Sequence, residues 1–246
     1  MYLNILLLFF FSFFSGLIIF FIPHLDGKRF KMLLTFSGAY LFSITVIHIL
    51  PELFHGEGDI SKIGIFVLGG FFLQMILEYF TSGVEHGHIH IHDEEISHIP
   101  YSMLISLGLH SLLEGTLLLH PSHTHNHGAS SSLLYGLILH KIPEAFALMS
   151  VLVFRLGKKY MAVFLLILFS CASPAGLYFS NMLYSLNTFS QNIFVYLFAI
   201  VAGNFLYIST TIFFENSPNH KFKANKLMIS LLGAFLAILA EYFLNR

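Results

Sequence analysis

The chain has 246 residues, of which 56% are hydrophobic and only 10% are charged, whereas about 25% of the residues in a typical globular domain are charged. This composition excludes an ordinary soluble domain and indicates a protein of the lipid bilayer. The formal net charge of −1 gives no indication of nucleic-acid binding. The single cysteine, Cys171, excludes an intramolecular disulfide and any metal cage built from several thiolates.

Eight apolar runs are long enough to cross a bilayer as helices. Helices are expected because the hydrocarbon core offers the backbone no hydrogen-bonding partners. We therefore predict an all-α, polytopic membrane protein that forms a single transmembrane domain over residues 1–246. The first run has no positive flank before it, which favours a retained span over a cleaved signal. In chain order, the predicted spans are 3–22, 33–54, 63–80, 101–119, 132–153, 160–180, 191–213 and 227–244.

Basic residues are distributed unevenly between the two sides of the predicted bundle. Nine of the twelve Lys and Arg residues lie in loops that follow odd-numbered spans, and two lie in loops on the other side. Because cytoplasmic loops carry an excess of Lys and Arg, both chain ends are predicted to be extracytoplasmic. The loop of residues 81–100 is then cytoplasmic, and the loop of residues 120–131 faces outward. We expect the protein in the plasma (inner) membrane.

Histidines are concentrated in these two loops, which flank the fourth span. Imidazole binds zinc, copper, iron and nickel, so flexible histidine-rich segments can gather metal ions weakly. The alternative for each loop is a merely polar, solvated segment, since neither has the spacing of a closed structural zinc site. The inner loop contains His86, His88, His90 and His92, and the outer loop contains His120, His123, His125 and His127.

The fourth and fifth spans each place a histidine and a glutamate four residues apart, and residues at this spacing share one helix face. They are His110 and Glu114 in the fourth span and His140 and Glu144 in the fifth. Because the loop between these spans is short, the helices are expected to be antiparallel neighbours. Ionisable groups at this depth cost roughly 3 kcal/mol each, so they are functional candidates by default. Pro143 should kink the fifth span and free a backbone carbonyl near the site.

Two imidazoles and two carboxylates form a ligand set that fits zinc and its first-row neighbours, whereas an all-oxygen set would indicate magnesium or calcium. A single histidine in a span is often only a hydrogen-bonded packing residue, and this alternative is much weaker for the two pairs together. The residues therefore predict a metal site within the membrane.

These motifs resemble those of the ZIP family of divalent-metal transporters. The resemblance covers all eight spans, the histidine-rich loop after the third span, the histidine-to-glutamate-glycine motif of residues 110–115, and the His-Lys-Ile-Pro-Glu motif of residues 140–144. The segments His-Ile-Leu-Pro-Glu at 48–52 and Ala-Gly-Asn-Phe-Leu-Tyr at 202–207 add support.

The resemblance implies a ZIP-like helix bundle that imports zinc, and often iron, manganese or cadmium, toward the cytosol. The imported ion would pass through a site shared by the fourth and fifth spans. The resemblance assigns the transport-site ligands to His110, Glu114, His140 and Glu144, and the outer entrance to His48 and Glu52.

The chain departs from the family at the positions that follow the two motif histidines. Many members bind two metal ions side by side, with asparagine or aspartate at these positions and a glutamate from the sixth span. Here the two positions are Ser111 and Lys141, and the sixth span has no carboxylate. A charged lysine has donors only and cannot be a ligand, but it can replace the second ion as a fixed positive charge. We therefore predict a site for one metal ion; the alternative is that Lys141 extends toward the membrane surface or only packs.

The predicted function is transmembrane transport of divalent cations, zinc first, without enzymatic activity. An intramembrane zinc-dependent hydrolase is one alternative, although the motif of two histidines flanking a glutamate is absent; a membrane metal sensor is another. We expect protons to compete with metal for the empty site, and we find no phosphate-binding loop that would support ATP coupling. The predicted partners are divalent metal ions and the lipid bilayer. A homodimer is one oligomeric state that the sequence allows.

Overall fold

The structure is a computed structural model that describes residues 1–22, 27–55, 58–81, 101–119, 129–186, 191–215 and 224–244. All regular elements in these ranges are helical. In chain order they are α1 (Tyr2–Leu17), η1 (Ile18–Phe20), α2 (Gly27–Ile44), η2 (Thr45–Ile49), α3 (Leu50–His55), α4 (Ile60–Thr81), α5 (Tyr101–Thr116), η4 (Leu117–Leu119), α6 (Ala129–Leu156), α7 (Lys159–Ser170), α8 (Ala172–Ser185), α9 (Gln191–Glu215) and α10 (Ala224–Leu244).

Among the described residues, seven helical segments are long and apolar enough to cross a membrane. Consecutive elements combine in three of them, because η1 extends α1, η2 and α3 extend α2, and α8 continues α7. The remaining predicted span is α5 with η4, whose apolar run is interrupted by the ionisable residues of the candidate site. The predicted all-α, polytopic fold is confirmed.

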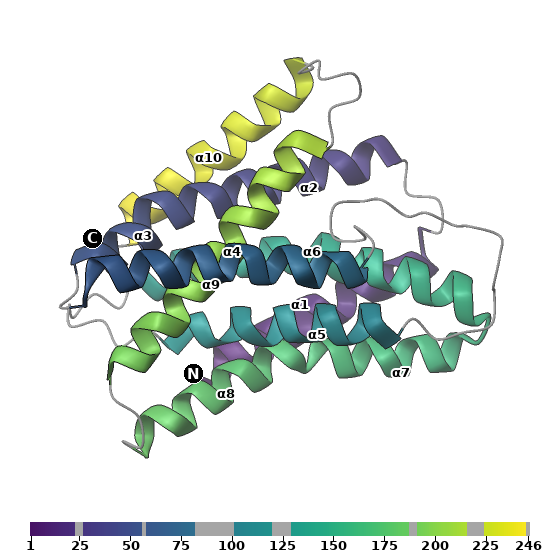
Figure 1. Ribbon diagram of the computed structural model, residues 1–246. Coiled ribbons are helices and arrows are strands. Elements are labelled where there is room, and N and C mark those ends of the chain that lie inside the picture. Colours follow the sequence, from purple (N-terminus) through teal and green to yellow (C-terminus); the bar gives the residue numbers. More distant parts are fainter. Residues whose placement is uncertain are drawn as a thin grey trace.

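The two chain ends lie at the same end of the bundle, on the left of Figure 1. A chain that crosses the membrane an even number of times begins and ends on the same side, as the eight predicted spans require. That this end faces away from the cytoplasm is still a prediction, which rests on the distribution of basic residues. We refer to it as the outer end.

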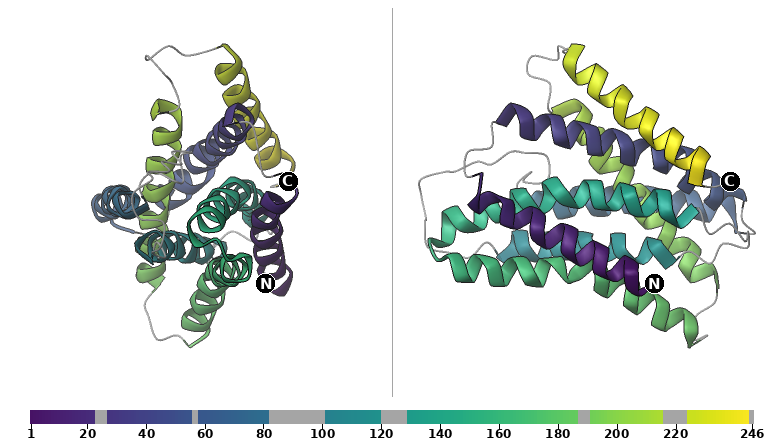
Figure 2. Two further views of the ribbon diagram at one scale, coloured as in Figure 1. Left: turned by 90° about the vertical axis from the view of Figure 1, so that its right-hand side faces the viewer. Right: turned by 180° about the vertical axis from the view of Figure 1, so that it is seen from behind.

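Helix α6 lies at the centre of the bundle, as the end-on view in Figure 2 shows. In the membrane-spanning segment of α6, 72% of the residues are buried, compared with 11% in that of α10. Helix α1 packs on α6 and α5 packs on α8, whereas α4 packs on α9 and α10 packs on α2. The outward faces of α1, α4 and α10 carry large apolar side chains such as Phe14, Ile65 and Phe235, as lipid-facing helices should.

Two prolines coincide with local changes in helix geometry. Pro51 follows η2, which is a π-helical turn, and this wider turn accommodates a proline ring that would press on the carbonyl four residues earlier. Pro174 lies in the first turn of α8, just after the break at Cys171, where the missing N–H costs no helical hydrogen bond. Pro143 lies inside α6, which continues through it as an α-helix.

Helices α5 and α8 come into backbone contact at Gly115. A Cβ at this position would overlap the carbonyl oxygen of Ser173, whereas a Cβ at Gly108 on the same helix has nothing within 4 Å. We predict that Gly115→Ala lowers the midpoint of thermal unfolding in detergent, because overpacking of this kind costs about 1–3 kcal/mol. Gly108→Ala is the matched control and should leave the midpoint unchanged. Equal midpoints for the two variants would contradict the close approach.

Candidate metal site between helices α5 and α6

The four predicted ligands lie on two helices that run in opposite directions, as Figure 1 shows. His110 and Glu114 are one turn apart on α5, and neither has any exposed surface. His140 and Glu144 on α6 are 1% and 2% exposed. Although α5 packs mainly on α8 and α6 mainly on α1, these side chains meet between the two helices.

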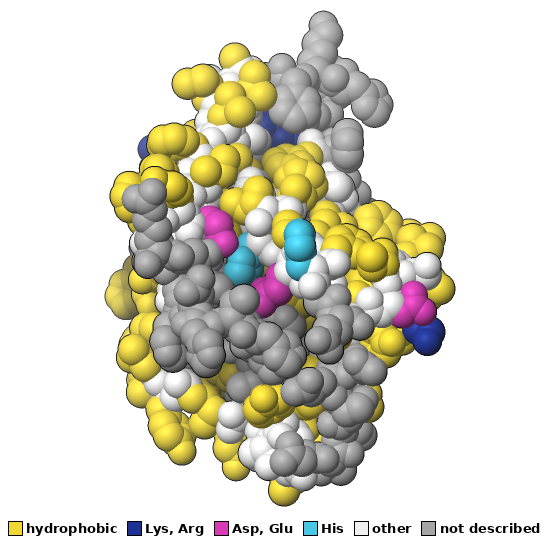
Figure 3. Space-filling model, turned by 90° about the vertical axis from the view of Figure 1, so that its left-hand side faces the viewer, with side chains coloured by type: hydrophobic (Ala, Val, Ile, Leu, Met, Phe, Trp, Pro, Cys, Tyr) yellow, Lys and Arg dark blue, Asp and Glu magenta, His cyan; other side chains and the backbone are white. Residues whose placement is uncertain are grey.

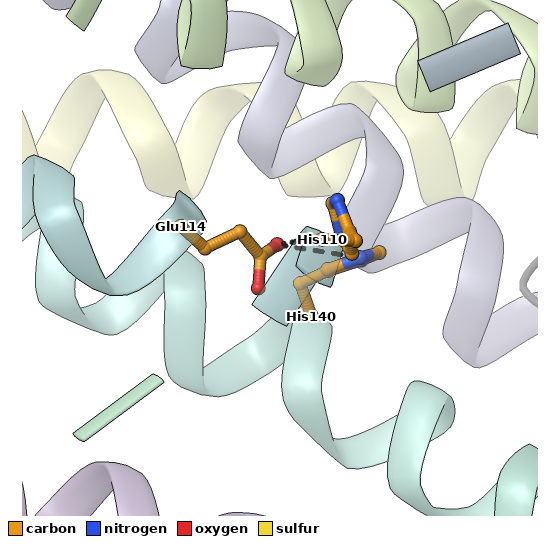
Figure 4. Close-up of side chains that lie close together, drawn as sticks. All are labelled: His110, Glu114 and His140. Atoms are coloured by element: carbon orange, nitrogen blue, oxygen red, sulfur yellow. Dashed lines mark ion pairs between the residues drawn. The ribbon is translucent and has the colours of Figure 1, made fainter. Parts of the chain in front are cut away.

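Three of the four side chains converge on one point, as Figure 4 shows. The Nε2 atoms of His110 and His140 lie 3.0 and 3.7 Å from Oε1 of Glu114. One ligand atom from each of these residues lies within 4.8 Å of the other two. Ligand atoms around a tetrahedral zinc ion are roughly 3.3 Å apart, because zinc bonds are about 2.0–2.2 Å long. The three side chains therefore need only a small inward movement to share one ion.

Lys141 lies between the two glutamates of the site. Its Nζ contacts Oε2 of Glu114 and lies 2.6 Å from Oε2 of Glu144. The lysine side chain is 1% exposed and its Nζ is 5.4 Å from the ring centre of Phe169. It does not extend to the membrane surface. Removing one member of such a buried ion pair typically costs about 3–5 kcal/mol, so the ammonium and the two carboxylates form a mutually dependent unit.

Ser111 points toward the sixth span. Its Oγ lies 2.8 Å from Oγ of Ser173 on α8, and the Ser173 hydroxyl also donates to the backbone carbonyl of Ser111 at 2.8 Å. Both serines are buried. These contacts join α5 to α8 beside the site.

The comparison with known families agrees with this geometry. The family model described as ZIP Zinc transporter matches residues 84–241, which cover more than half of the chain and both helices of the site. The chain belongs to the ZIP zinc transporter family. Membership makes this an integral, multi-pass membrane protein that transports divalent metal ions, and it confirms the resemblance found in the motifs. No curated protein matches the sequence at a significant level.

In this ZIP protein, the residues predicted to line the outer entrance lie together at the outer end of the bundle. Nε2 of His48 on η2 lies 3.4 Å from Oε2 of Glu52 on α3, and their side chains are 12% and 22% exposed. Figure 3 shows this end, where histidine and acidic side chains gather near the middle of the face. That these residues line the outer entrance stays a prediction.

A third member of this outer cluster, Glu241 of α10, was missed by the sequence analysis. Its Oε1 lies 2.9 Å from Nδ1 of His48, and its side chain is 20% exposed. Its position in the sequence contained a usable signal, because Glu241 is the only acidic residue of the last span. A carboxylate in such a run is a functional candidate by default.

The two histidine-rich loops of this ZIP chain fall outside the described residues. The histidines concerned are His86, His88, His90 and His92 in the inner loop and His120, His123, His125 and His127 in the outer loop. Helix α6 already begins at Ala129, so the outer loop is shorter than the predicted range of 120–131. A metal-gathering role for either loop stays a prediction.

Proposed function

We propose that the protein carries zinc, or a related cation such as iron, manganese or cadmium, into the cytosol through the site between α5 and α6. The observation that supports this most directly is the convergence of His110, Glu114 and His140 in a fully buried position. Two imidazole nitrogens and a carboxylate oxygen suit zinc and its first-row neighbours.

Glu144 is proposed to complete the ligand set once a cation arrives. It is linked to the other three residues through Lys141, which contacts both glutamates. A dication near Glu114 attracts both carboxylates more strongly than the singly charged ammonium does. The dication would therefore replace the ammonium as their direct partner. The ammonium stays close by and repels a second dication, which limits the site to one ion.

The proposed direction is supported by the predicted orientation of the chain and by the partly exposed residues of the outer end. His48 and Glu52 are partly exposed there and would receive the ion before it reaches the buried site. The inner histidine-rich loop would gather it after release. The driving force would be the metal gradient or coupling to ions, since the sequence has no ATP-binding loop.

Uptake of radioactive zinc into sealed vesicles tests this function. The purified protein is reconstituted, and vesicles with the chain ends outside are selected by protease cleavage of a terminal tag. We expect uptake that saturates with zinc concentration and needs only a zinc gradient. Unlabelled iron, manganese and cadmium then rank the competing ions. An uptake rate equal to that of protein-free vesicles would contradict the proposal.

The inner loop gives a separate prediction. If its histidines only gather released metal, replacing residues His86, His88, His90 and His92 together with serine should leave the initial rate of vesicle uptake unchanged. The same variant should alter hand-off of the ion in cells, measured with a cytosolic zinc indicator. A complete loss of vesicle uptake would place the loop in the conduction path instead.

A further inference from the structure

Glu241 links three helical elements at the outer end of the bundle. Its Oε1 faces Nδ1 of His48 at 2.9 Å, and its Oε2 accepts a hydrogen bond of 2.8 Å from the hydroxyl of Ser132 on α6. The buried hydroxyl of Tyr40 on α2 donates to the backbone carbonyl of Ser132 at 3.2 Å. The outer part of α6 is therefore bonded to both α10 and α2.

These bonds restrain the helix that supplies half of the proposed transport site. Ser132 lies about two turns before His140 on α6, which also carries Lys141 and Glu144. Helix α6 packs mainly on α1, whereas the helices of Tyr40 and Glu241 pack on one another. The hydrogen bonds at Ser132 thus reinforce the direct packing of α6 on α2 and α10.

The carboxylate that holds Ser132 is also chemically suited to bind a cation. With His48 and Glu52 it forms a partly exposed cluster of one imidazole and two carboxylates, the same ligand types as in the buried site. A dication interacts with a carboxylate more strongly than a neutral hydroxyl does. A dication that binds both oxygens of Glu241 would therefore displace the Ser132 hydroxyl from Oε2.

We infer that Ser132 and Glu241 form an outer latch that a divalent cation releases, while the Tyr40 bond to the Ser132 carbonyl restrains the same part of α6. Without the cation, Glu241 holds the outer part of α6 against α10. When the cation binds to His48, Glu52 and Glu241, the carboxylate leaves Ser132 and α6 can move relative to α10, with the Tyr40 bond as its remaining hydrogen bond to α2 at Ser132. The inference rests on the proposed function, because the ion that opens the latch is the ion to be transported.

The KM for zinc uptake separates this role from a merely structural one. Ser132→Ala removes the latch but keeps all three cation-binding side chains, so binding no longer has to release α6 and KM should fall. We expect a fall of about threefold, which matches the average strength of hydrogen bonds between membrane helices. Glu241→Gln keeps an oxygen that can accept the Ser132 hydroxyl but loses the charge that binds the cation, so KM should rise. Ser132→Thr keeps the hydroxyl and should keep the wild-type KM.

A second readout does not depend on transport. Leu41 of α2 is fully buried and faces Gly136 of α6, one turn from Ser132. In a Cys171→Ala background, Leu41→Cys provides a single thiol at this interface, which a membrane-impermeant maleimide added from the outer side can label. Ser132→Ala should accelerate labelling and Ser132→Thr should not. Tyr40→Phe, which removes the other bond to α6, is an independent variant with the same expected result.

The possible results distinguish failure of the latch from failure of the proposed transport function. Unchanged labelling in both Ser132→Ala and Tyr40→Phe would overturn the latch. KM changes of the same sign in Ser132→Ala and Glu241→Gln would overturn it as well. Faster labelling of these variants in a protein whose wild-type form takes up no zinc would support the latch while rejecting the proposed transport.

Discussion

Replacing any one of His110, Glu114, His140 or Glu144 with alanine is expected to reduce saturable zinc uptake to the level of protein-free vesicles. The first three residues converge within 4.8 Å, so each removal takes away a quarter or more of a small ligand set. Loss of either glutamate also leaves Lys141 buried with one fewer carboxylate contact. The measurement is the initial rate of radioactive zinc uptake as a function of zinc concentration.

Two controls distinguish loss of ligands from loss of folding. Glu114→Gln keeps the size of the side chain and removes its charge, and it should be as inactive as the alanine variant. His55→Ala removes a histidine at the end of α3, whose Nδ1 lies 2.7 Å from the carbonyl of Pro51, and it should transport normally. Insertion is checked by size-exclusion profiles in detergent. Wild-type uptake by correctly inserted His140→Ala and Glu144→Ala proteins would remove the site from the account.

The fold class and the central histidine–glutamate pairs could be predicted because they depend on local properties of the chain. Long apolar runs indicate spans, and a spacing of four residues places His110 and Glu114 on one helix face. The π-helical turn at Thr45–Ile49 could not be predicted, because proline at position 51 permits several local solutions. The start of α6 at Ala129 was likewise missed, since polar residues at a helix end carry little signal.

Contacts between distant parts of the chain were harder to predict. The pairing of His48 with Glu241 joins residues 193 positions apart and follows from the packing of α10 on α2. From the sequence, Lys141 was predicted to be a fixed charge in place of a second ion. The alternative was extension toward the membrane surface or mere packing, because a lysine can extend to the surface from many depths. Two carboxylates, Glu114 across the helix interface and Glu144 one turn away, draw it into the site instead.

Replacing Lys141 and Ser111 together with asparagine is expected to create room for a second metal ion. In the native protein the ammonium occupies the space beside both glutamates, and Ser111 is hydrogen bonded to Ser173. The double variant exchanges a donor-only cation and a short hydroxyl for two amide oxygens. Equilibrium binding of zinc to the purified protein should therefore rise by one ion per chain relative to wild type. Zinc bound by the histidine-rich loops is the same in both proteins, so it does not affect the difference in the number of bound ions.

The matched control for this prediction is Lys141→Arg combined with Ser111→Asn. It keeps a positive charge that cannot be a ligand, so the number of bound ions should equal that of the wild type. An additional ion in this control would mean that charge at position 141 does not set the stoichiometry. No additional ion in the double asparagine variant would mean that the second position is closed for another reason.

Anomalous X-ray diffraction at the zinc absorption edge, from crystals of the wild-type protein soaked in zinc, tests the central claim most directly. We expect one peak between α5 and α6, bounded by His110, Glu114, His140 and Glu144, at distances of about 2.0–2.2 Å from its ligands. Two peaks about 3.5–4 Å apart at this position would show a two-metal site and contradict the role of Lys141. Zinc peaks elsewhere in the protein with none between α5 and α6 would contradict the transport site itself.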